Sequence, residues 1–156
     1  MLFKSGVKKV IAFAMAACMI FAMSATAFAT EMAYDVAFYK ADGTTSMATN
    51  VLNGEAVYDS DEHTLTIPIK KVFMMRNHPD TGILTPFYGC LTGMVVEGTA
   101  VGSAAWEANE IVIEDFYPNS SNSYTVEFTV EVRNFFTGSV VHFSDMDGAT
   151  ATMVLS

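Results

Sequence analysis

Residues 124–133 read YTVEFTVEVR, with an apolar or aromatic side chain at every second position and a polar or charged one between. A period of two is typical of a β-strand that turns one face to a core and the other to water. The same alternation recurs in residues 33–39, 64–69 and 149–155. The sequence therefore predicts an antiparallel sheet that covers a hydrophobic core.

Turn residues separate these runs and set the number of strands. We predict eight strands, at residues 33–39, 55–58, 64–74, 87–97, 110–116, 123–133, 139–144 and 149–155. Many short strands without a long helix indicate an all-β sandwich or barrel. Pro68 predicts an edge or a bulge in the third strand. The prolines of residues 76–86 predict a long loop, and residues 145–148 (Asp-Met-Asp-Gly) predict a hairpin turn between the last two strands.

One stretch breaks the alternation. Residues 44–52 read TTSMATNVL, and a serine or threonine at its start can cap a helical turn. We therefore predict a short helical turn directly after the first strand.

The first 29 residues predict export from the cell. Three lysines precede an apolar run over residues 10–23, and the small residues of 25–29 (ATAFA) follow it. This pattern is typical of a secretory signal with an Ala-x-Ala cleavage site, here after Ala29. We expect one mature domain, residues 30–156, that is secreted or associated with the cell surface.

Two alternatives remain for this segment. A transmembrane anchor would need roughly 20 apolar residues, and the run is shorter than that. A lipoprotein would need Cys18 as its lipidated residue, and Cys18 lies in the middle of the apolar run.

The charge of the mature chain restricts its partners. Residues 30–156 hold five basic and all 17 acidic side chains, a net charge of −12. Such a surface repels the phosphate backbone, so we do not expect a nucleic-acid partner. Only Cys90 remains after cleavage, so an intramolecular disulfide is excluded and the core must hold the fold. An apolar neighbourhood favours a buried Cys90 over a reactive one.

Motifs for catalysis are missing, because the chain has neither a Gly-x-Ser-x-Gly elbow nor a His-Glu-x-x-His pair. We expect that the protein is not an enzyme. His142 lies between apolar neighbours on a predicted strand, where it could ligate a metal or a haem or simply lie at the rim. Acidic residues gather at 59–62 and 145–147, but neither run completes a calcium loop. Acidic turns are common without a metal, so we do not expect calcium at either.

The order of these features resembles the NEAT (near iron transporter) domain of Gram-positive cell-surface haem proteins. Residues 36–41 (VAFYKA) lead into residues 42–48 (DGTTSMA), followed later by residues 91–98 (LTGMVVEG), a long alternating strand and a terminal hairpin. The resemblance covers roughly residues 33–155. It implies an immunoglobulin-like β-sandwich of about eight strands that binds haem non-catalytically for iron acquisition.

The resemblance also implies a site between the helical turn and the last hairpin. Ser46 would donate a hydrogen bond to a haem propionate, and Met47 would cover one face of the ring. The full set of expected ligand-binding residues is Tyr39, Ser46, Met47, Val51, Val140, His142, Met146 and Met153. A haem, or a protein that carries haem, would be the partner.

The chain departs from the family in its last hairpin. Haem-binding members carry Tyr-x-x-x-Tyr there, whereas residues 140–156 contain no tyrosine. Histidine and methionine also bind haem iron, so His142 becomes the expected metal ligand. The alternative is an adhesion module that binds a protein, such as another cell-surface protein, or a carbohydrate without haem. Four aromatic residues motivate this alternative, namely Tyr39, Tyr88, Trp106 and Tyr117.

Overall fold

Ten antiparallel β-strands and one 3₁₀ helix make up the regular structure of residues 31–156, the part of the chain that the computed structural model describes. The predicted secretion signal, its cleavage site after Ala29 and Cys18 lie outside the described residues. Within residues 31–156, no helix is long and apolar enough to cross a bilayer. The predicted all-β, antiparallel class is confirmed.

Most connections between the elements are short, and the longest joins β9 to β10. In order they are β1 (Glu31–Tyr34), β2 (Val36–Tyr39), η1 (Met47–Val51), β3 (Ala56–Asp59), β4 (Thr64–Pro68), β5 (Val72–Asn77), β6 (Leu84–Val96), β7 (Ala100–Ser103), β8 (Glu110–Glu114), β9 (Ser123–Asn134) and β10 (Ala149–Leu155). The predicted helical turn is confirmed, and it is η1.

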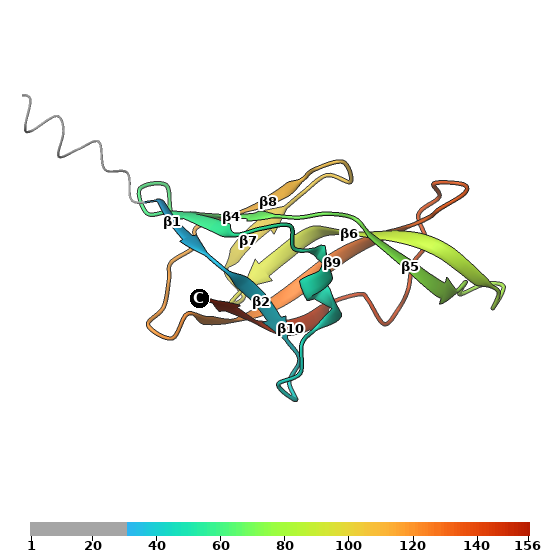
Figure 1. Cartoon of the computed structure of the whole chain (residues 1–156), viewed down its shortest axis with the longest axis horizontal. Coiled ribbons are helices and arrows are strands. Elements are labelled where there is room, and N and C mark those ends of the chain that lie inside the picture. Colours follow the sequence, from blue (N-terminus) through green and yellow to red (C-terminus); the bar gives the residue numbers. More distant parts are fainter. Residues whose placement is uncertain (1–30) are drawn as a thin grey trace, which may run out of the picture. The chain divides into compact units, whose positions relative to one another are not determined.

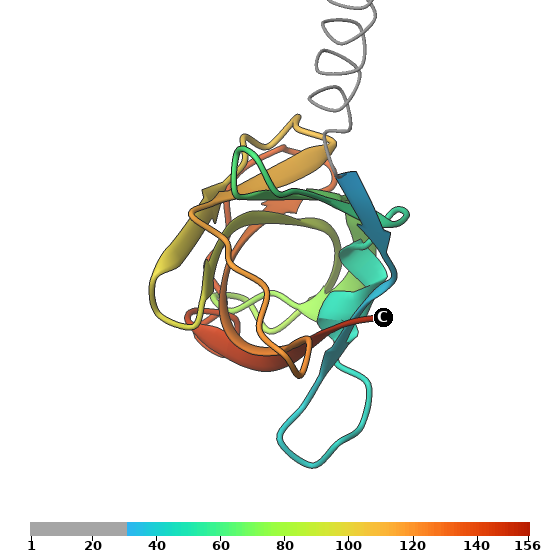
Figure 2. The same cartoon turned by 90° about the vertical axis from the view of Figure 1, so that its left-hand side faces the viewer.

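The strands form one sheet in the order β1-β3-β4-β8-β7-β6-β9-β10-β2, with β5 added beside β6 (Figure 1). Viewed along its length, the sheet curls into a nearly closed barrel (Figure 2). Asp35 joins the two ends of the sheet, because β1 pairs with β3 while β2 pairs with β10. Its backbone exchanges two hydrogen bonds with Ser156, N–O 2.8 and 3.0 Å.

The core consists of inward side chains from almost every strand. Phe38, Leu65, Ile111 and Met153 have no exposed surface. The ring of Phe38 meets the ring of Phe128 edge to face, with centroids 5.0 Å apart. A second, smaller cluster of Phe87, Val132 and Phe143 lies beneath β6 and β9, at the end of the sheet where β5 joins β6.

Several strand boundaries differ from the prediction. The predicted strand 33–39 is broken at Asp35 into β1 and β2, and the predicted strand 64–74 is two strands, β4 and β5. β4 pairs with both β3 and β8, so it is not an edge strand, and its register with β8 has no bulge. Pro68 is the last residue of β4, opposite Glu110 of β8 and beyond the end of the pairing with β3 at Thr66. β7 was not predicted, because small residues such as Gly102 hide its alternation.

One predicted loop and one predicted strand are wrong. Residues 76–86 are not a long loop, because β5 and β6 form a hairpin in register from Val72↔Gly89 to Asn77↔Leu84. Residues 139–144 are not a strand, because only Val140 forms an isolated bridge, with Arg133. β10 therefore pairs with β9 itself, and residues 135–148 form the connection between them.

Candidate functional site

The predicted site residues fall into separate groups in the structure. The first group lies on η1 and β2. The Ser46 N–H donates to the Phe38 carbonyl (2.8 Å), and its hydroxyl accepts a hydrogen bond from the Ala48 N–H (3.3 Å), which makes it the N-cap of η1. The Thr49 hydroxyl donates to the Phe38 carbonyl and accepts from its N–H, both at 3.1 Å. η1 is thus held firmly against β2.

Side chains around η1 differ sharply in exposure. Met47 is 73% exposed at the start of the turn. Tyr39 is half-buried at the end of β2, opposite Thr152 of β10. Val51 and Met153 are buried in the main core, so neither is accessible from the surface. Of the predicted set, Met47 is therefore the most available residue on this side.

The second group lies along the part of β9 that has no pairing with β10. β10 accompanies β9 only as far as the pair Ala149↔Phe128, so beyond this pair β9 has β6 on one side and residues 135–148 on the other. This connection returns along β9 through the hydrogen bonds Val141 N–H to Val132 C=O (2.8 Å) and Asn134 N–H to Ser139 C=O (2.9 Å). It then turns, and Phe143 enters the smaller core cluster.

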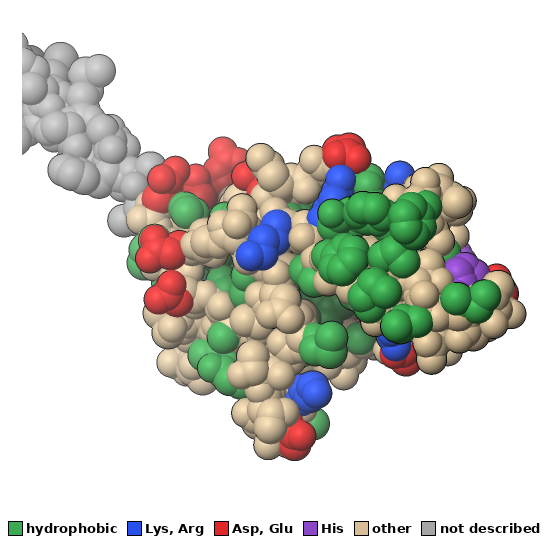
Figure 3. All heavy atoms as spheres, turned by 45° about the vertical axis from the view of Figure 1, so that its right-hand side comes forward, with side chains coloured by type: hydrophobic (Ala, Val, Ile, Leu, Met, Phe, Trp, Pro, Cys, Tyr) green, Lys and Arg blue, Asp and Glu red, His purple; other side chains and the backbone are tan. Residues whose placement is uncertain are grey.

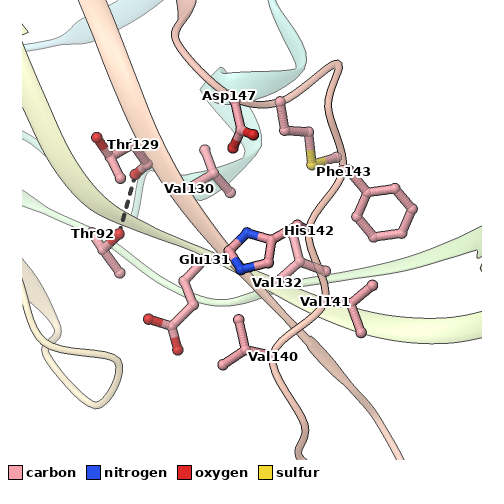
Figure 4. Close-up of a pocket in the computed structure, with 11 residues that line it drawn as sticks. Thr92, Thr129, Val130, Glu131, Val132, Val140, Val141, His142, Phe143 and Asp147 are labelled. Atoms are coloured by element: carbon pink, nitrogen blue, oxygen red, sulfur yellow. Dashed lines mark hydrogen bonds between the residues drawn. The ribbon is translucent and has the colours of Figure 1, made fainter. Parts of the chain in front are cut away.

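A pocket of about 200 Å³ lies between this part of β9 and the connection formed by residues 135–148 (Figure 4). Its apolar lining comes from Val130, Val132, Val140, Val141, Phe143 and Met146. Its polar lining comes from Thr92, Thr129, Glu131, His142 and Asp147. The pocket therefore brings together three of the predicted site residues, namely Val140, His142 and Met146.

His142 is the distinctive residue of this pocket. Its side chain is exposed, and within residues 31–156 it has no hydrogen-bond or ion-pair partner. The other two histidines are engaged. His63 Nδ1 lies 3.3 Å from the Tyr58 hydroxyl, and His78 Nδ1 accepts a hydrogen bond from the Asp80 N–H (3.2 Å). Both ring nitrogens of His142 thus remain available to a ligand.

The acidic residues near His142 do not complete a site for a bare metal ion. Glu131 is paired with Arg133 at 2.6 Å, and Asp145 is paired with Arg76 at 2.6 Å. The hydrogen bond from Arg76 lowers the pKa of Asp145 below its usual value. Among the described residues, no three His, Cys, Asp or Glu side chains are grouped to hold a metal ion. A metal held by His142 would therefore need its remaining ligands from elsewhere.

The predicted acidic clusters serve turns and ion pairs instead. The Asp59 carboxylate accepts hydrogen bonds from the N–H groups of Asp61 (2.9 Å) and Glu62 (3.1 Å), which stabilises the turn between β3 and β4. Asp145 is held by Arg76.

A second feature, which sequence reasoning missed for the most part, is a surface of exposed apolar side chains at the β5–β6 end of the domain (Figure 3). We call it the aromatic surface, and it consists of Phe73, Met75, Ile83, Leu84, Tyr88, Phe135 and Phe136. Phe73, Tyr88 and Phe135 contact one another, with ring centroids 5.5 to 6.0 Å apart. Phe136 is 76% exposed.

Only Tyr88 of this surface was among the aromatics singled out from the sequence. Tyr39 and Trp106 are half-buried, and Trp106 lies under the cations of Lys71 and Arg133, 4.8 and 4.5 Å from its ring centroid. Tyr117 is exposed but stacks on His63 away from this surface. A signal was present in Phe135-Phe136, because both lie between the predicted strands 123–133 and 139–144, and connections usually run over the surface.

Comparison of this chain with protein-family models, with curated proteins and with solved structures finds no match.

Proposed function

We propose that this chain is an exported, non-catalytic domain that binds a haem-type tetrapyrrole at the pocket beside β9, with His142 as the iron ligand. The observation that carries the proposal is His142 itself. It is an unpartnered imidazole in a pocket whose other walls are mainly apolar. A tetrapyrrole supplies four nitrogen ligands to its iron, so a single histidine from the protein is a sufficient axial ligand.

The size of the pocket limits how such a ligand can bind. Sites that enclose a small molecule usually have roughly 300–1,000 Å³, and this pocket has about 200 Å³. We expect it to accept one edge of the macrocycle, while the rest remains at the surface with its charged propionates in water. Val140, which is 49% exposed, and Met146 would contact the ring beside His142.

The resemblance to NEAT domains supports the same proposal from the sequence side and extends it to an immunoglobulin-like fold. On this basis Met47 would cover part of the ring, and Ser46 would contact a propionate. The high exposure of Met47 is compatible with that role. Ser46 already uses its hydroxyl as the cap of η1, so a propionate would bind its remaining donor.

Titration of residues 30–156 with haemin tests the proposal. We expect a shifted Soret band at equimolar protein, and we expect His142→Ala to abolish the shift because it removes the axial ligand. His78→Ala is the matched control, since His78 lies outside the pocket and should leave the spectrum unchanged. A spectrum equal to that of free haemin, or an unchanged shift in His142→Ala, would overturn the proposal.

Met47→Ala distinguishes the role of η1. If Met47 covers the ring, this variant weakens haemin binding but keeps the band position, because the axial ligand is intact. Unchanged affinity would restrict the site to the pocket beside β9.

A further inference from the structure

β5 is a free edge of the sheet. Within the described residues its only strand partner is β6, so one side of Val72–Asn77 has no strand beside it. An edge strand of six residues presents unpaired N–H and C=O groups to another strand. Proteins usually protect such an edge, and an uncovered one is a ready place for strand addition.

The hairpin register shows which backbone groups point outward. Met75 lies opposite Pro86, which has no N–H, and the Pro86 carbonyl accepts a hydrogen bond from Phe135 N–H on the β9 side (3.1 Å). Met75 and Pro86 therefore form a non-hydrogen-bonded pair. The N–H and C=O of Met75 point away from β6, and those of Phe73 and Asn77 do so by the same alternation.

The outer face of this edge is apolar. Phe73 and Met75 are 52% and 49% exposed, and Phe73 contacts Tyr88 and Phe135 of the aromatic surface. Exposed apolar surface beside unpaired backbone groups indicates an interaction site more strongly than either feature alone.

Charges at the two ends of β5 indicate what kind of strand fits it. The domain carries a net charge of −12, which opposes self-association in general. Around β5, however, Lys71, Arg76 and Arg133 are already paired with carboxylates. Lys70 before the strand and Asp80 after it are exposed, and neither forms an ion pair within residues 31–156. One end of the edge is thus locally positive and the other locally negative.

An antiparallel copy of β5 complements this arrangement. With Met75 opposite the partner's Met75, the outward-pointing backbone groups of Phe73 and Asn77 meet those of the partner's Asn77 and Phe73. The Lys70 end of each strand then lies alongside the Asp80 end of the other, so two opposite-charge contacts form at once. The two aromatic surfaces lie on the same face of the joined sheet.

We propose that two copies of this chain associate through antiparallel pairing of their β5 edges. This interface is isologous, as a twofold axis requires. It goes beyond the proposed tetrapyrrole site, because it uses none of the pocket residues.

Sedimentation equilibrium of residues 30–156 without haemin tests the proposal over a wide range of protein concentration. We expect a dimer that dissociates on dilution. Met75→Pro removes an outward N–H from each copy but no hairpin hydrogen bond, so it should weaken the dimer about tenfold or more. Tyr117→Ser, which removes an exposed aromatic elsewhere, is the control and should leave the association unchanged.

A charge exchange tests the register. Lys70→Glu and Asp80→Lys should each weaken the dimer, and the double variant should restore it. If circular dichroism shows that the Met75→Pro variant is unfolded, Phe73→Lys replaces it as the interface variant.

A protein that stays monomeric at all concentrations would overturn the proposal, as would a dimer insensitive to the β5 variants. A monomer that co-sediments with phosphatidylcholine vesicles would assign the aromatic surface to lipid instead. Because haemin is absent, each of these outcomes leaves the tetrapyrrole proposal unaffected.

Discussion

The guanidinium of Arg76 lies 2.6 Å from a carboxylate oxygen of Asp145, and its central carbon lies 4.6 Å from the ring centroid of Phe143. This contact joins the β5–β6 hairpin to the connection between β9 and β10. The hairpin and the pocket wall are therefore parts of one assembly, although they are far apart in the sequence.

Loss of this ion pair should be visible in the dependence of stability on pH. Because Arg76 lowers the pKa of Asp145 in the folded state, the pair contributes stability above the unfolded carboxyl pKa of about 3.9. This contribution is lost as the pH falls through the lowered pKa. Both side chains are partly exposed, so we expect only about 0.5 kcal/mol.

Urea denaturation of Asp145→Asn and the unchanged protein, between pH 2.5 and 7, measures this difference. The two unfolding free energies should differ at neutral pH and converge in acid. A constant difference over the whole range would contradict the expected linkage.

Phe143 belongs to the smaller core cluster, and its removal should lower the stability far more than removal of the ion pair. The side chain is 7% exposed and meets the ring of Phe87 edge to face, 5.2 Å between centroids. We expect Phe143→Ala to lower the free energy of unfolding by about 3 kcal/mol. Phe136→Ala is the matched control, because Phe136 is exposed, and it should change stability by about 0.5 kcal/mol or less. Similar losses for both variants would show that Phe143 does not fill a core.

The sequence was sufficient for the class of the fold and for several of its elements. The alternation of residues 124–133 predicts β9 because its inward side chains pack on one core along most of its length. The serine before Met47 predicts η1 because helix caps act locally. Strand alternation and helix caps depend on residues that are close together in the sequence, so they can be identified without knowledge of the tertiary structure.

The errors arose where distant residues determine the structure. Nothing near Asp35 indicates that the two halves of residues 33–39 pair with opposite ends of the sheet, because the partners are β3 and β10. Residues 139–144 alternate like a strand, but they form only one isolated bridge with β9, between Val140 and Arg133. Phe143 packs in the cluster with Phe87. The predicted site residues also depend on tertiary contacts, and the structure places them in different surroundings. Met47 lies on η1, His142 lines the pocket, and Met153 is in the core.

Gly102 should be the most sensitive glycine in the sheet. A Cβ on Gly102 would lie 2.9 Å from the Val112 carbonyl oxygen and 3.0 Å from a side-chain carbon of Ile113. The backbone of β8 cannot easily move, so we expect Gly102→Ala to destabilise the protein by about 1–3 kcal/mol. Gly89→Ala provides the comparison, because there the new Cβ would meet only the terminal methyl of Met74, which can rotate away. The free energy of unfolding in urea should be clearly lower for Gly102→Ala than for Gly89→Ala. The reverse order would contradict this reasoning.

Cys90 should behave as a core residue and not as a reactive thiol. It has no exposed surface, and burial raises the pKa of its thiol above the usual value. A thiol-specific reagent such as DTNB at pH 8 should therefore react slowly with the native protein, because it needs both solvent access and a thiolate. The same sample in denaturing urea should react at once and gives the control.

The raised pKa of Cys90 also has a consequence for stability. The folded state disfavours the thiolate, so the stability of the protein should fall as the pH rises above the unfolded thiol pKa of about 8.5. Tyr58 and Tyr124, whose pKa values are raised by burial as well, should extend this fall to higher pH. Cys90→Ala removes the thiol contribution, so its stability should decline less steeply between pH 8 and 10. An equally steep decline in this variant would show that the thiol does not contribute to the pH dependence. Immediate labelling of the native protein would show that Cys90 is accessible to solvent.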